Sequence, residues 1–154
     1  MSDPEPDVPD IEVEVEDPAW NAVPEVEALV RRAALAARPD GGVVVLLTDD
    51  ASVAELNQQF RHKAGPTNVL SFPAPENPEN LLGDIALAYG VCAREAAEQG
   101  KTLADHLSHL TVHGVLHLAG YDHQTDDEAE AMEELERRVL AALGISDPYA
   151  TEQS

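Results

Sequence analysis

The sequence has one cysteine, few aromatic residues and no apolar run as long as a membrane span. The lone Cys92 cannot form an internal disulfide, so a reducing cytoplasm is the simplest location. A membrane-spanning helix needs about 18 consecutive apolar residues, and none is present. The N-terminus also lacks the basic region and apolar core of a secretion signal. We therefore expect a cytoplasmic protein.

Basic residues are scarce as well, because nine Lys and Arg oppose 30 Asp and Glu, for a net charge of −21. The excess acid lies mostly at the two ends of the chain. Residues 1–27 contain no Lys or Arg, and residues 122–154 contain only two. So negative a field disfavours non-specific binding of nucleic acid. An RNA substrate would therefore have to enter a local basic patch.

The length of 154 residues suits one domain with a hydrophobic core of its own. Residues 1–9 are rich in Pro and acid, show no hydrophobic period and are predicted to be a disordered tail. Residues 10–145 are predicted to form the single domain. Residues 146–154 are predicted to be a frayed C-terminal tail.

Hydrophobic periodicity predicts the elements of that domain. In chain order they are a strand at 11–16, a helix at 24–38, a strand at 43–47, a helix ending near 61, strands at 67–72 and 85–89, a helix at 91–99, a helix opened by Thr102, and a last helix opened by Thr125. This order indicates an α+β domain. In the second helix, Val53, Leu56 and Phe60 are predicted to mark the core face. Cys92 is predicted to be a small core residue.

The strongest chemical signal is a pair of histidines, His113 and His117, four residues apart in a segment with helical spacing. Side chains at i and i+4 lie one above the other on a helix face. Gly120 can end the helix in a left-handed conformation, so that the chain turns back and brings His123 to the same point. Three neutral imidazoles that converge on one point suit Zn²⁺, with the fourth position left to water.

The spacing matches a known zinc pattern, His-Glu-x-x-His-x-x-Gly-x-x-His, except that Gly114 replaces the glutamate. In metalloproteases that carboxylate is the general base, so its absence argues against a zinc peptidase. It does not argue against the metal, because the three histidines remain. The general base is left unassigned.

Three further histidines have weaker signals. His109 lies four residues before His113, so spacing does not exclude it as a ligand, but the simpler prediction is that it orients a ligand through a carboxylate or carbonyl. His106 is predicted to lie on the surface. His62 follows Arg61 and could equally be an exposed helix end. On the sequence alone, Arg61 is best explained by pairing with a surface acid.

The chain resembles the YbeY endoribonucleases, also called rRNA maturation factors, over about residues 11–145. Three blocks carry the resemblance, and the third is highly specific. They are Leu56-Asn57 through Arg61 with Pro66-Thr67-Asn68-Val69-Leu70-Ser71-Phe72-Pro73; Leu82-Gly83-Asp84-Ile85; and His109-Leu110 through His113-Gly114, Leu116-His117-Leu118 and Gly120-Tyr121-Asp122-His123.

The resemblance implies a mixed four-stranded sheet packed with about five helices, one of them a zincin-like metal helix. It implies one zinc ion held by His113, His117 and His123. It also implies cleavage of single-stranded RNA, with roles in maturing the 3′ end of small-subunit rRNA and in ribosome quality control. The implied partners are the small ribosomal subunit, a ribosomal protein and the Era GTPase.

The resemblance places Arg61 on a functionally important arginine and Lys63 on a nearby basic position. A guanidinium can hold two non-bridging phosphate oxygens at once, which suits the charge that develops during phosphodiester cleavage. Lys63 would add a point charge. The alternatives are a ribosome-assembly factor with a purely structural zinc, and a zinc hydrolase of another substrate.

Overall fold

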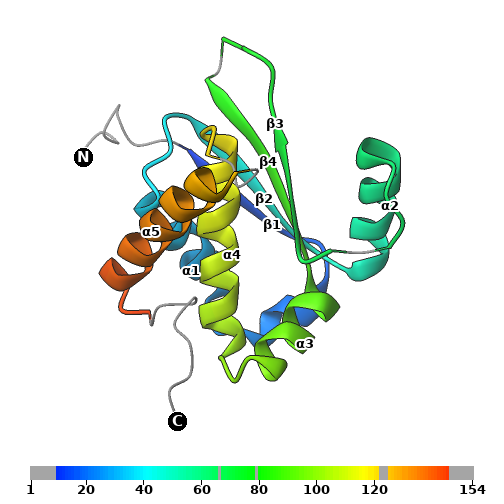
Figure 1. The fold of residues 1–154 in the computed structure, drawn as a ribbon. Helices are drawn as coiled ribbons and strands as arrows, with labels where there is room; N and C mark the ends of the chain where they lie inside the picture. Colours follow the sequence, from blue (N-terminus) through cyan, green and yellow to red (C-terminus); the bar gives the residue numbers. More distant parts are fainter. Residues whose placement is uncertain (1–9, 66, 79, 122–124, 146–154) are drawn as a thin grey trace, which may run out of the picture.

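The chain folds into one mixed sheet with helices on both faces (Figure 1). The computed structural model describes residues 10–65, 67–78, 80–121 and 125–145. The elements are β1 (Ile11–Val15), the 3-10 helix η1 (Pro18–Ala22), α1 (Val26–Ala36), β2 (Gly42–Thr48), α2 (Asp50–Arg61), β3 (Val69–Pro73), β4 (Leu81–Ala88), α3 (Tyr89–Glu98), α4 (Leu103–Leu118) and α5 (Asp126–Ala142). The predicted α+β class is confirmed. Both predicted tails lie outside the described residues.

The four strands are arranged in the order β1-β2-β4-β3. β1, β2 and β4 run parallel, and β3 runs antiparallel to β4 at one edge of the sheet. The sheet is therefore mixed, as the resemblance implies. The sheet has two edge strands, β1 and the antiparallel β3, and the residues of the candidate site lie near β3.

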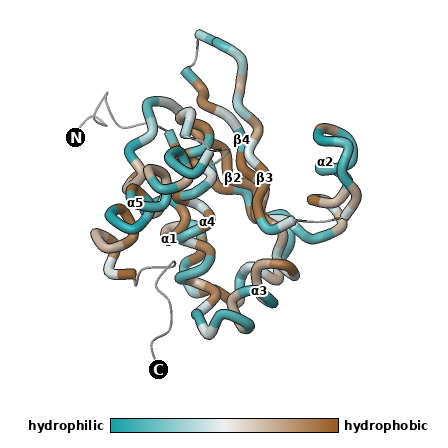
Figure 2. Tube along the Cα trace, viewed as in Figure 1, coloured by the Kyte–Doolittle hydropathy of each residue, from teal (hydrophilic) through white to brown (hydrophobic). Residues whose placement is uncertain are grey.

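Alternation along the strands gives the sheet two different faces. Val43, Val45 and Leu47 of β2 point into the main core, which α1 and α4 cover. On the opposite face, Leu70 and Ala86 pack with residues of α2. Figure 2 shows hydrophobic colouring along β2, β3 and β4 between these layers. None of the described helices combines the length and the apolar composition that crossing a membrane requires.

The strand predicted at 85–89 was wrong at both ends. β4 begins at Leu81 rather than Ile85, because Gly83 and Asp84 pair with residues of β2 inside the ladder. Tyr89 is the first residue of α3 and does not belong to the strand. The buried 3-10 helix η1 was not predicted from the sequence. Trp20 anchors it, because the side chain is fully buried and the indole Nε1 donates to the carbonyl of Thr48 at 2.9 Å.

The predicted core role of Phe60 is also wrong, because its side chain is 58% exposed. Val53, two turns earlier on α2, is fully buried against the sheet, and Leu56 packs partly against the same cluster. Phe60 has the right helical phase for the core, but it contacts Phe72 of the edge strand β3 with most of its side chain in solvent.

Helix α4 positions the candidate site, and its start follows the sequence prediction. The side chain of Thr102 accepts from the backbone N–H of Asp105 and caps the first turn. Gly114 lies where α4 presses against β4: a Cβ added there would be 2.9 Å from Cδ1 of Ile85, which is fully buried. The residue that departs from the zinc-peptidase pattern is thus the residue that allows the helix to approach the sheet.

This contact predicts that the glutamate of the peptidase pattern cannot be restored. We expect Gly114→Glu to lower the free energy of unfolding by at least about 3 kcal/mol, because it overpacks the core and buries a carboxylate against an apolar side chain. Chemical denaturation of the purified variant measures this. Ala131→Glu, on the exposed face of α5, is the matched control and should change stability by less than about 0.5 kcal/mol. A fully stable Gly114→Glu protein would contradict the packing described here.

Candidate active site

Three histidines form a stripe along one side of α4. His109, His113 and His117 succeed one another at four-residue intervals in Leu103–Leu118, and all three are partly exposed. The rings of His113 and His117 are nearly parallel, with an interplanar angle of 6° and centroids 6.3 Å apart. The helical spacing thus orients the two imidazoles alike, as the sequence predicts.

A buried carboxylate on the neighbouring helix holds two of these histidines. Glu136 of α5 is fully buried. Its Oε2 lies 2.7 Å from Nδ1 of His113, and its Oε1 lies 2.9 Å from Nε2 of His109. Because a carboxylate oxygen accepts, the two ring nitrogens that face it donate. The neutral ring of His113 then has its lone pair on Nε2, the tautomer that a metal ligand needs.

Sequence reasoning missed Glu136. Met132 and Leu140 recur at helical spacing in the last helix, and both are buried. Glu136 lies four residues from each, so it occupies the middle of the core face. A charged residue in the centre of an apolar stripe is rarely buried without a partner. That spacing was the available signal that Glu136 is buried with a polar partner, although it does not identify the partner.

Two of the three predicted zinc ligands are brought together. His113 and His117 share the same side of α4, whereas His123, and with it Asp122, lies outside the described residues. Within the described ranges, no three His, Cys, Asp or Glu side chains gather as a metal site. The donor set nevertheless fits Zn²⁺, because the two imidazoles are aligned and one of them donates to a buried carboxylate, as histidines bound to zinc do.

Arg61 approaches this helix from the other side of the edge strand. Its Nη2 donates to the backbone carbonyl of Ser71 on β3 at 2.9 Å. The hydroxyl of Ser71 makes a long, 3.5 Å hydrogen bond to the carbonyl of Gly114, the residue after His113. Through the short strand β3, the guanidinium is therefore tied to the segment of α4 that carries the histidines.

The expected pairing of Arg61 with a surface acid is not seen in the part of the chain that the structure describes. Arg61 and Lys63 are both exposed, and neither forms an ion pair with a described carboxylate. The backbone N–H of Lys63 donates to the carbonyl of Asn57, which fixes the turn after α2. Two cations are thus held near the edge of the sheet without a described partner of opposite charge.

The remaining described histidines and the cysteine do not belong to the histidine stripe of α4. The prediction that His106 lies on the surface is wrong: it is 3% exposed, its Nε2 lies 2.9 Å from Oε1 of Glu95, and burial lowers its pKa. His62 is exposed and ends α2 in a left-handed conformation with φ 56°. Cys92 is fully buried, as predicted, and burial raises the pKa of its thiol, which keeps it protonated and unsuited to bind metal.

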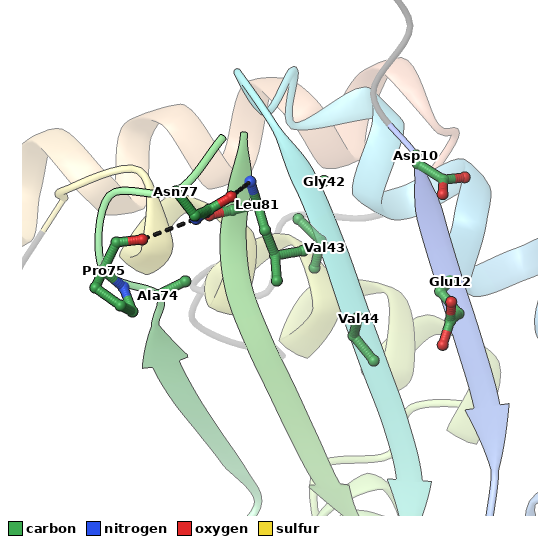
Figure 3. Close-up of a pocket in the computed structure, with 9 residues that line it drawn as sticks. All are labelled: Asp10, Glu12, Gly42, Val43, Val44, Ala74, Pro75, Asn77 and Leu81. Carbon is green, nitrogen blue, oxygen red and sulfur yellow. Dashed lines mark hydrogen bonds between the residues drawn. The ribbon is translucent and has the colours of Figure 1, made fainter. Parts of the chain in front are cut away.

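A separate cavity of about 380 Å³ opens at one end of the sheet (Figure 3). It is lined by Asp10 and Glu12 of the first strand region, by β2, and by the loop that contains Asn77. Asn77 holds this loop through hydrogen bonds to Pro75 and Leu81. Its described lining residues include two acids and no base, a charge that disfavours phosphate.

Comparison with known proteins gives a consistent result. A family model described as endoribonuclease YbeY matches residues 12–144. A Maricaulis maris protein named endoribonuclease YbeY is 55% identical, with 92% of each chain covered. A Rhodopseudomonas palustris protein of the same name is 51% identical, covering 92% of this chain and 91% of its own. A solution structure of a Thermotoga maritima protein aligns with a TM-score of 0.56 at 28% identity, covering 92% of this chain and 99% of that one.

The hydrogen bonds that join Glu136 of α5 to His109 and His113 of α4, here called the Glu136 bridge, predict a stability effect that is independent of any metal. We expect Glu136→Gln to lower the free energy of unfolding of metal-free protein by about 1–3 kcal/mol, because an amide cannot accept from both rings at once. Urea denaturation in the presence of a chelator measures this. Glu133→Gln is the control on the same helix, since Glu133 only reaches Arg137 at 3.9 Å on the surface, and it should cost less than about 1 kcal/mol. Equal effects of the two substitutions would contradict the bridge.

Proposed function

The chain belongs to the YbeY endoribonuclease family, and we propose that it cleaves single-stranded RNA at one zinc ion held by His113, His117 and His123. We further propose that the substrate is the 3′ end of small-subunit rRNA and that the enzyme serves ribosome quality control in the cytoplasm. Its partners would then be the small ribosomal subunit, with a ribosomal protein and the Era GTPase.

The single observation that carries the zinc proposal is the buried Glu136 behind His113. Burying a carboxylate is costly unless strong hydrogen bonds compensate it. Here it orients two imidazoles, and in one of them it directs the proton to Nδ1 and leaves Nε2 as the donor atom. A stripe of histidines used only for packing would not need this arrangement.

When bound, zinc would supply a Lewis acid that activates water or polarises a phosphoryl oxygen. The residues of the chain do the rest. His113 is held by Glu136 in one tautomer and one ring orientation. Arg61, anchored on the carbonyl of Ser71, presents its guanidinium for the charge that develops on the non-bridging oxygens. Lys63 adds a second positive charge at the same edge. Gly114 has no side chain that could act as a base, and a side chain at this position would point into the sheet.

Metal analysis combined with a cleavage assay tests the zinc proposal. We expect about one zinc per wild-type chain, loss of cleavage on chelation, and loss of both metal and activity in His117→Ala. Glu136→Gln should bind zinc about 10–100-fold more weakly in chelator competition, because the ligand His113 loses the carboxylate that orients its ring. Binding should not be lost, because the ligands themselves remain. His62→Ala is the control for zinc content and should match wild type. Full zinc content in His117→Ala, or cleavage that is indifferent to chelators, would refute the proposal.

A second test isolates the role of Arg61. We expect Arg61→Ala to lower kcat by about 10²–10³-fold in metal-replete protein, which is the usual cost of losing one donor to a developing oxyanion. Arg61→Lys should recover only part of this, because an ammonium cannot hold two oxygens side by side. Arg94→Ala is the matched control, since Arg94 is exposed and pairs with Asp50 at 3.7 Å. Unchanged kcat in Arg61→Ala would rule out this assignment.

A further inference from the structure

The two phenylalanines of the chain lie against each other at the surface. The sequence contains only Phe60 and Phe72, and their ring centroids are 5.5 Å apart at an interplanar angle of 64°. Phe60 is 58% exposed, the highest value among the exposed large hydrophobic residues that the structure describes. Single exposed apolar residues are common on protein surfaces, so the exposure of Phe60 gains meaning only from the groups around it.

The pair lies beside the proposed catalytic arginine. Phe60 precedes Arg61 in α2, and Phe72 follows Ser71, whose carbonyl accepts from Arg61. Successive side chains of a strand point to opposite faces, so Phe72 points toward α2 whereas Ser71 points toward α4. The aromatic pair and the histidine stripe therefore lie on the two sides of the same edge strand, and Arg61 contacts that strand through the carbonyl of Ser71.

The charge around the pair is unusual for this protein. Arg61, His62 and Lys63 follow Phe60 directly, and the nearest acids in the sequence are Glu55 and Glu76. In a chain with a net charge of −21 this is a local basic segment, and no described carboxylate neutralises its Arg or Lys. Exposed aromatic rings next to cations are the composition of single-strand nucleic-acid sites.

We propose that Phe60, supported by Phe72, is a stacking platform for one unpaired base of the RNA substrate. This inference rests on the proposed function, because it places the RNA strand across the sheet edge formed by β3. The base stacks on Phe60, the following phosphates contact Arg61 and Lys63, and the RNA continues toward the histidines on α4. A base inside a duplex has both faces covered and cannot stack on Phe60. The platform therefore provides a physical basis for selecting single strands.

Binding of a fluorescently labelled single-stranded RNA, measured by anisotropy in a His117→Ala background that does not cleave it, tests the platform. We expect Phe60→Ala to raise Kd about 5–100-fold, the range for losing one stacked base, and Phe60→Trp to keep wild-type affinity. Leu81→Ala is the matched control, because Leu81 is 36% exposed and lies by the acidic cavity of Figure 3. It should leave Kd unchanged.

An RNA in which abasic sites replace each nucleotide in turn identifies the contact. On the abasic oligonucleotide that lacks the stacked base, Phe60→Ala should bind as well as its parent, so that the penalty disappears. An equal penalty on every abasic oligonucleotide, or no penalty on intact RNA, would overturn the proposal. So would unchanged RNA affinity together with weaker binding to isolated small ribosomal subunits, since the ring would then be a docking contact for protein.

Failure of this inference is distinguishable from failure of the proposed function. In the otherwise wild-type enzyme, Phe60→Ala should raise KM for single-stranded RNA with kcat little changed, because the ring acts in binding. If the wild-type enzyme cleaves RNA with zinc and Phe60→Ala matches it in KM, only the platform is wrong. If zinc-loaded wild type cleaves no RNA, the proposed function is wrong. The anisotropy measurements of RNA binding then test the stacking platform separately.

Discussion

The buried carboxylate of Glu136 is the contact on which the geometry of this site depends. It joins α5 to α4 through two histidines, at 2.7 Å and 2.9 Å, in a region otherwise packed with apolar side chains. Such a group is stable only when its partners are fixed, so it ties the orientation of the His113 ring to the packing of two helices. Moving α5 would change the candidate zinc ligand as well as the core.

The edge strand β3 has a corresponding role on the other side of α4. It lies between the helix that carries the histidines and the helix that carries Arg61, and its Ser71 contacts both. Because β3 is antiparallel and terminal, its two faces bring together segments about 50 residues apart in the chain. Strand Val69–Pro73 is therefore short but positions Arg61, the arginine that we assign to the proposed reaction.

Much of the fold could be predicted from local patterns. The four-residue spacing of His113 and His117 placed both on one side of a helix, and the caps at Thr102 and Thr125 marked where helices start. These signals are local, because i,i+4 geometry and capping depend only on neighbouring residues. Phe60 shows their limit, because helical phase indicates which face a residue shares but not how deeply that residue is buried.

The amino-acid sequence alone established the class of fold, the helix with its row of imidazoles, and the family to which its motifs point. Which groups meet was settled by packing between distant segments. Glu136 reaches His113 across 23 positions, Arg61 finds Ser71, and Gly114 makes room for Ile85. No periodicity encodes these contacts, because each depends on how one element lies against another in three dimensions.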